Sequence, residues 1–231
     1  MGQVALLCKQ DRLYRAETRE AEKGDKEKEK EARRRRRGRR QGRGQGQGKR
    51  RGGEALMRIG IVADTHGNED LMMRAAAMLQ DMFEVERFIH LGDNEGDADK
   101  LSSLGLPHIG VPGIYDSDYP EKGDSCAHME DIGDFTLVAI HDLRDLGRLR
   151  GRAFHIVCHA HSHSHTLAVN LGKLFLNPGH LKGEKDRGNP PSCAFLEIKE
   201  GTAKATIVDL KGEVLSEMEF ILPKGDDGSN F

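Results

Sequence analysis

The stretch that decides the fold of this chain is RIGIVADTHG, residues 58–67. Its apolar part, residues 59–63, has the length and composition of a short strand that is buried on both faces of a sheet. Asp64 and His66 follow directly, and residues i and i+2 of an extended segment point the same way. These two side chains can therefore converge beyond the strand, where a carboxylate with an imidazole makes half of a metal site.

Charge divides the chain into two parts. Residues 1–56 hold 19 Lys and Arg against 9 Asp and Glu, a net charge of +10, whereas residues 57–231 hold 17 against 29, a net charge of −12. All 11 histidines lie in the second part. We therefore expect a disordered basic tail over residues 1–56 and one acidic globular domain over residues 57–231, which is long enough for a single core.

The tail allows three interpretations. Residues 33–51 contain only Arg, Lys, Gly and Gln, a composition that predicts disorder. Arginines neutralise phosphates regardless of sequence, so an arm that binds nucleic acid is one interpretation, and a solvated tail is another. The third is that the natural chain starts at Met57, two residues before the first core residue, with no tail at all.

Composition also bounds the compartment and the partners. No apolar run approaches the roughly 20 residues of a spanning helix. The four cysteines are scattered without a Cys-x-x-Cys pair, which suits a reducing compartment. We expect a cytoplasmic protein without membrane contact, and the acidic domain disfavours nucleic acid as a partner except through the tail.

The rest of the domain begins with alternating helices and strands and ends with strands alone. Asn68 is an expected helix N-cap. Helical spacing predicts one buried face, made of Leu71, Ala75, Met78, Leu79 and Met82. Further strands are expected at residues 87–91, 107–111, 135–140, 153–158, 166–171, 174–176, 194–199, 203–210 and 213–221.

Five of these strands end at residues that can bind a metal. The residues are Asp64 with His66, then Asp93, Asp116, His141, and His159 with His161. Sites in open α/β sheets lie beyond the carboxyl ends of strands. Five such endings in succession predict a composite metal site of nitrogen and oxygen ligands, and the two oxygens of Asp93 suit it to bridge two ions.

These residues resemble the calcineurin-like metallophosphoesterase superfamily, in particular its small single-domain bacterial and archaeal phosphodiesterase branch. The family pattern runs Asp-x-His, Gly-Asp, Gly-Asn-x-Asp, a His after a strand, Gly-His-x-His and Asn-Pro-Gly-Ser. The same order is found here at residues 64–66, 92–93, 113–116, 141, 158–161 and 177–180. The resemblance implies an α/β fold, a four-layer α/β/β/α sandwich of two mixed sheets.

The resemblance also implies a ligand set. It places a first metal ion on Asp64, His66 and His161, a bridging carboxylate at Asp93, and a second ion on His141 and His159, with Asp93 and His141 at the catalytic centre. Ile114 replaces the Asn that the family uses at the second site, which is one ligand short unless Asp116 or Asp118 substitutes. Two smaller departures are Cys158 in place of Gly and His180 in place of Ser.

The histidine run leaves the register of the last two ligands open. His159, His161, His163 and His165 alternate with small residues, so an extended chain turns all four to one side. His159 directly follows the apolar end of the expected strand, which favours the pair His159 and His161. The alternative is a register two residues later, with His161 and His163.

The resemblance implies a metal-dependent phosphodiesterase that acts through a metal-activated hydroxide at a site with two divalent ions. Mn²⁺ is the expected ion, with Fe, Zn, Ni and Mg as alternatives. The short span between Asp116 and His141 leaves little room for a lid, which favours a small phosphodiester substrate, and members of the branch often form homodimers. The alternative is a catalytically weak or inactive protein-binding scaffold, as in a retromer subunit of this branch, and Ile114 favours it.

Overall fold

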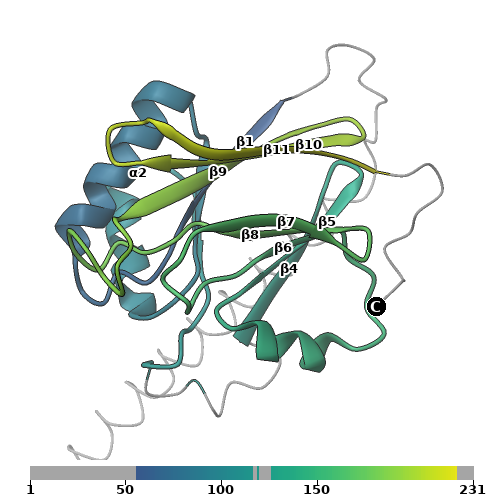
Figure 1. Cartoon of the computed structure of the whole chain (residues 1–231), viewed down its shortest axis with the longest axis horizontal. Helices are drawn as coiled ribbons and strands as arrows, with labels where there is room; N and C mark the ends of the chain where they lie inside the picture. Colours follow the sequence, from purple (N-terminus) through teal and green to yellow (C-terminus); the bar gives the residue numbers. More distant parts are fainter. Residues whose placement is uncertain (1–55, 117–118, 120–125, 223–231) are drawn as a thin grey trace, which may run out of the picture. The chain divides into compact units, whose positions relative to one another are not determined.

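The computed structural model describes residues 56–116, 119 and 126–222 (Figure 1). The expectations for the tail therefore lie outside the described residues, except at Leu56. Within the described ranges, no helix combines the length and the apolar character that crossing a membrane requires.

The first sheet has six strands with the opening stretch inside it, as predicted. Its strands are, in spatial order, β11 (Val214–Ile221), β10 (Thr202–Asp209), β9 (Ser192–Lys199), β1 (Met57–Val62), β2 (Arg87–His90) and β3 (His108–Gly110). The pairs β1–β2 and β2–β3 are parallel, and the other pairs are antiparallel. The parallel half brings the carboxyl ends of β1 and β2 to one edge, where the ligand-type residues begin.

The second sheet has five strands and is also mixed. Its spatial order is β4 (Ala127–Ile132), β5 (Phe135–Ile140), β6 (Ile156–Cys158), β8 (Lys173–Asn177) and β7 (Thr166–Asn170). β5, β6 and β8 are parallel to one another. The sequence did not predict β4, an edge strand that pairs only with β5 and carries His128, Glu130 and Asp131 among its six residues.

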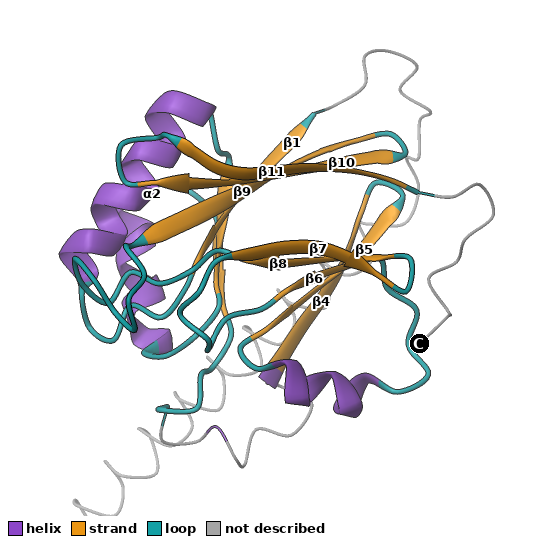
Figure 2. Cartoon of the chain, in the orientation of Figure 1, coloured by secondary structure: helices purple, strands orange, loops and turns teal. Residues whose placement is uncertain are grey.

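The expected four-layer sandwich of two mixed sheets is confirmed. Helix α2 (Glu69–Phe83) and the 3-10 helix η1 (Glu95–Leu104) cover the outer face of the first sheet, and the 3-10 helix η4 (Leu143–Leu149) covers the second. Figure 2 shows the two sheets stacked, with η4 beneath the second. The main core lies between them and includes Ile61, Leu137 and Leu176. The fourth layer is thin because η4 has only seven residues.

Helix α2 starts as predicted and buries a slightly different face. The Asn68 side chain accepts a hydrogen bond from the Leu71 N–H and caps the helix. Leu71, Ala75 and Leu79 are buried as expected, together with Met72. The prediction for Met82 is wrong, since this side chain is 56% exposed in the last turn of the helix.

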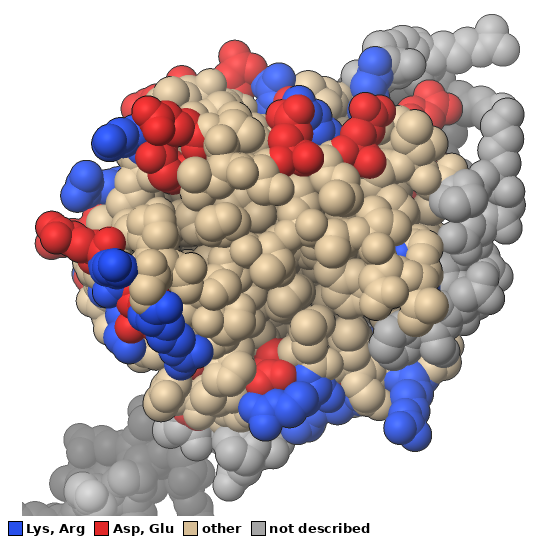
Figure 3. Space-filling model, viewed as in Figure 1, with Lys and Arg blue, Asp and Glu red and all other residues tan. Residues whose placement is uncertain are grey.

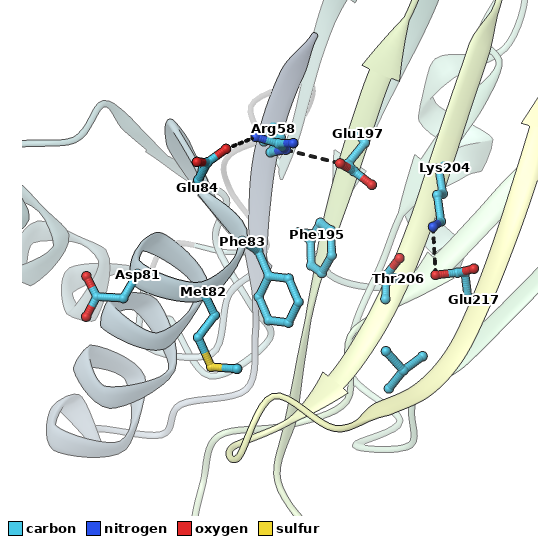
Figure 4. A pocket seen from close by; sticks show the side chains of 11 residues that line it. Arg58, Asp81, Met82, Phe83, Glu84, Phe195, Glu197, Lys204, Thr206 and Glu217 are labelled. Atoms are coloured by element: carbon cyan, nitrogen blue, oxygen red, sulfur yellow. Dashed lines mark hydrogen bonds and ion pairs between the residues drawn. The ribbon is translucent and has the colours of Figure 1, made fainter.

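A cavity of about 350 Å³ lies on the outer face of the first sheet, beside the carboxyl end of α2 (Figure 4). Phe83 and Phe195 stack there with their ring centroids 4.6 Å apart. Arg58 bridges Glu84 and Glu197 at its rim. None of the residues that line this cavity is a candidate metal ligand.

The edge strands β7 and β11 lie against one another on the same side of the sandwich. They and the turn after β7 expose apolar side chains, which are Val169, Leu171, Val214, Leu215 and Ile221. The middle of the face in Figure 3 accordingly shows a broad area without Lys, Arg, Asp or Glu.

Candidate metal centre

Six acidic and imidazole side chains converge where four strands end. The loops after β1 and β2 contribute Asp64, His66 and Asp93 from the first sheet, and those after β5 and β6 contribute His141, His161 and His163 from the second. They form two groups, Asp64, His66, Asp93 and His163, and Asp93, His141 and His161. Within each group the candidate ligand atoms lie within 4.8 Å of one another, and Asp93 belongs to both.

The separations between these atoms suit shared ions. Asp93 Oδ1 lies 3.3 Å from His141 Nε2, and Asp93 Oδ2 lies 3.5 Å from His66 Nε2. His66 Nε2 lies 3.2 Å from His163 Nε2, which is 3.9 Å from Asp64 Oδ2. Two atoms that each lie roughly 2.0–2.2 Å from one ion are separated by about 3 to 3.5 Å at right or tetrahedral angles.

Several of these atoms are buried without a hydrogen-bond partner among the described residues. They are both carboxylate oxygens of Asp64, Oδ2 of Asp93, Nε2 of His141 and Nδ1 of His161. Leaving a buried polar atom unpaired costs on the order of 1–3 kcal/mol. Five such atoms around two shared positions, all of them oxygen or imidazole nitrogen, fit divalent metal ions.

The backbone at these residues is held in an uncommon conformation. Asp64, His66, Asp93, His161 and His163 all have positive φ, between 48° and 69°. Non-glycine residues of this kind cluster at functional sites and persist only where the surrounding structure enforces them. The strain therefore indicates that the fold places these side chains for a purpose other than stability.

A close backbone approach fixes Asp93. A Cβ atom on Gly113, in the loop after β3, would lie 2.1 Å from the Asp93 nitrogen. The N–H of Tyr115 in the same loop donates to Asp93 Oδ1. Gly113 thus allows this loop to press on Asp93 and orient its carboxylate.

A second layer of hydrogen bonds holds the loop of Asp64 and His66. The Thr65 hydroxyl donates to Asp97 Oδ2 at 2.6 Å and lies 3.0 Å from His90 Nε2. Asp97 also accepts from the Gly67 N–H. Burial lowers the pKa of His90 to about 4, so its ring is neutral at pH 7.

Burial sets the charge state of the candidate ligands in the absence of an ion. Burial first, and then the neighbouring Asp93 charge, raises the pKa of Asp64 to about 8. Burial lowers the pKa of His66, of His141 and, to about 4, of His163. Neutral imidazole is the form that coordinates metals, so these histidines are ready to bind at pH 7.

The structure differs from the expected histidine pair. His159 still pairs with β8 through its N–H, which donates to the Leu176 carbonyl, and its side chain is buried outside both groups. The chain turns two residues later, at His161 and His163, which both have positive φ. The geometry thus supports the alternative register, with His163 in the first group and His161 in the second.

Ile114 leaves the second group without the carboxamide that the family pattern has there. The Asp116 carboxylate accepts from the Gly113 N–H at 2.7 Å and closes its own turn, so it does not join the group. Asp118 lies outside the described residues. His180 is buried, its Nε2 donates to the Asn189 carbonyl, and its ring centroid lies 5.7 Å from that of His163.

Sequence reasoning missed the residues that support the ligands. Asp186, whose carboxylate contacts His163 Nδ1, lies 23 residues further along the chain, and Asp97 lies 32 residues from Thr65. The alternating histidines gave no signal of which pair enters the site, because the strand pairing that keeps His159 out of it involves Leu176, 17 positions away.

A two-sheet sandwich that gathers buried carboxylates and imidazoles at its strand ends defines a metal-binding α/β protein. Residues 57–201 match the family model of the calcineurin-like phosphoesterase superfamily domain, and the chain belongs to this family. The probable metallophosphoesterase YsnB of Bacillus subtilis (strain 168) is 25% identical over 175 residues, which cover 71% of this chain and 97% of that protein.

Solved structures share the fold at lower identity. YfcE, a phosphoesterase from E. coli, is 16% identical with a TM-score of 0.55 and covers 71% of this chain and 100% of its own. Vacuolar Protein Sorting 29 from Cryptosporidium parvum is 18% identical with a TM-score of 0.54 and covers 72% and 98%. At these identities the likeness establishes the fold and leaves the activity to the site.

Proposed function

We propose that this protein hydrolyses a small phosphodiester at a centre that holds two divalent metal ions. The observation that carries the proposal is the position of Asp93, a buried carboxylate shared by two groups of candidate ligand atoms, several of which are buried without a hydrogen-bond partner among the described residues. The family assignment supports a metal-dependent phosphoesterase. The diester, the second ion and Mn²⁺ as the ion are the proposed refinements.

The roles of the residues follow from the two groups. Asp64, His66 and His163 would hold the first ion, His141 and His161 would hold the second, and Asp93 belongs to both groups. Bound ions of this kind polarise a phosphoryl oxygen and acidify a water molecule. The His141 ring is aligned because its Nδ1–H donates to the Leu91 carbonyl at 2.7 Å, which leaves Nε2 to face Asp93.

The surroundings of the centre favour an accessible diester with a good leaving group. Tyr115 stands beside His66 with ring centroids 5.4 Å apart and is 65% exposed. It occupies the place at which another branch of the family carries a proton-donating His, so the proton donor of that branch is not provided at this position. A diester whose leaving group departs without protonation suits this arrangement.

The test is hydrolysis of bis(p-nitrophenyl) phosphate by the full chain, stripped of metal and then titrated with Mn²⁺, Zn²⁺, Ni²⁺ or Mg²⁺. We expect a rate that rises with metal and falls at least about 100-fold in His141→Ala. The monoester p-nitrophenyl phosphate should react more slowly. A folded protein that shows no metal-dependent rate on either ester would overturn the proposal.

A protein-binding scaffold is the second candidate. Two observations favour it, the missing second-group ligand at Ile114 and the exposed apolar side chains over β7 and β11. A scaffold has no need of turnover, so the metal-dependent hydrolysis rate separates the two functions.

A further inference from the structure

We propose that Asp186 is a positioning residue that sets the tautomer and the orientation of His163, so that His163 Nε2 faces the first metal ion. The inference deepens the proposed metal centre and rests on it. It concerns a residue that belongs to neither ligand group.

The contact between the two side chains is short and directional. His163 Nδ1 lies 2.5 Å from Asp186 Oδ2, and the His163 side chain is almost fully buried. A carboxylate accepts, so Nδ1 carries the hydrogen and Nε2 keeps its lone pair. Nε2 is the atom that lies 3.2 Å from His66 Nε2 and 3.9 Å from Asp64 Oδ2.

Hydrogen bonds hold the segment that carries Asp186 against the loop that carries His161 and His163. The backbones of Asp186 and Asn189 exchange two hydrogen bonds of 3.0 and 2.8 Å. The Arg187 guanidinium donates to the His161 carbonyl, and the Asn189 amide donates to the Ser164 hydroxyl. Asp186 is thus held against the histidine loop by contacts that do not involve its own carboxylate.

The acceptor of His163 differs in kind from that of His141. The backbone carbonyl of Leu91, directly after β2, orients His141, whereas a charged side chain orients His163. A carboxylate behind a ligating imidazole raises its basicity as well as aligning it. A substitution at residue 186 can therefore remove the effect without disturbing the sheet.

The experiment compares the full chain with Asp186→Ala, Asp186→Asn and the control Glu184→Gln. Glu184 is an exposed acid of the same segment, so its substitution removes the same charge. Titration calorimetry with Mn²⁺ and Zn²⁺ should show a 10- to 100-fold loss of affinity at one of two sites in Asp186→Ala, by analogy with other supporting partners of ligands. Asp186→Asn keeps an acceptor and should lose less, and Glu184→Gln should match the wild type.

A second readout follows the tautomer directly. In the metal-free protein, ¹⁵N chemical shifts of the histidine rings should show His163 with hydrogen on Nδ1, and Asp186→Ala should lose this preference. Unchanged tautomer and unchanged affinity in Asp186→Ala would overturn the inference. Absence of metal binding by the wild type would overturn the proposed function, whereas the tautomer measurement would still decide the role of Asp186. If Asp186→Ala does not fold, Asp186→Asn decides in its place.

Discussion

His159 and His163 lie four residues apart, and only His163 faces the ligand cluster. We expect His163→Ala to lose one metal ion and at least about 100-fold in hydrolysis, with the fold intact by circular dichroism. His159→Ala should keep both ions and lose roughly 1–3 kcal/mol of unfolding free energy, because it opens space under a buried loop. Metal content and urea unfolding measure both. Loss of an ion in His159→Ala together with retention of both ions in His163→Ala would instead support His159 and His161 as the ligand pair.

The pKa of Asp64 predicts how the metal-free protein responds to pH. The carboxyl titrates near 4 when unfolded and at about 8 when folded. Between these values the folded state binds the extra proton, so rising pH lowers stability, and no further loss follows above about 8. The slope is at most about 1.4 kcal/mol per pH unit.

We therefore expect metal-free Asp64→Asn to gain stability relative to the wild type as pH rises from 5 to 8.5, measured by urea unfolding at each pH. His90, His159 and His163, whose pKa is lowered to about 4, act in the opposite direction between about pH 4 and 6.5. They are common to both proteins, so the difference isolates Asp64. A difference that does not change with pH would contradict the assignment of the proton to this carboxyl.

Ile114 stands where the family pattern has a ligand, so Ile114→Asn should add one. We expect tighter binding of the second ion by about 10-fold and a higher metal-dependent rate, measured by calorimetry and by diester hydrolysis. Ile114→Val is the matched control, since it changes volume and adds no donor. Equal affinities in Ile114→Asn and Ile114→Val would mean that the loop after β3 does not reach the second ion.

At the scale of elements, the loop after β3 acts through its closeness to Asp93. In Gly113→Ala the added Cβ would meet the Asp93 backbone at 2.1 Å, so the two loops must separate. We expect a loss of roughly 2 kcal/mol or more and weaker binding of both ions, because both share Asp93. Gly96→Ala, whose Cβ meets no atom within 4 Å, is the control for metal affinity.

The sequence was sufficient for the elements whose signals are local. The apolar run of residues 59–63 predicted β1, and Asp64 after it was predicted as a candidate ligand. Asn68 predicted the start of α2. Strand β4 was not predicted because His128, Glu130 and Asp131 interrupt its apolar pattern. Local patterns also gave no sign that the strand-end residues come from two different sheets; the family resemblance implied that arrangement.

The histidine register and Asp186 depend on contacts between distant residues. Whether His159 belongs to the strand or to the site is decided by its hydrogen bond to Leu176, 17 positions away. Asp186 contacts His163 across 23 positions of the chain. The spacing of the histidines therefore predicts neither the register of the pair nor the contact between Asp186 and His163.

At the scale of the whole domain, the two halves of the ligand set come from opposite sides of the main core. Asp64, His66 and Asp93 extend from the first sheet, and His141, His161 and His163 extend from the second. Two bound ions would therefore cross-link the two sheets. At 100 times the dissociation constant a ligand adds about 2.7 kcal/mol to the folded state.

The consequence is mechanical as well as chemical. Chelation should weaken the packing of the two sheets. Amide hydrogen exchange should then become faster along β1, β2, β5 and β6 together, far from the loops that contact the ions. Faster exchange confined to the ligand loops would mean that the two sheets hold together without help. If the ions hold the two sheets together, removal of the metal weakens the packing of the core between them.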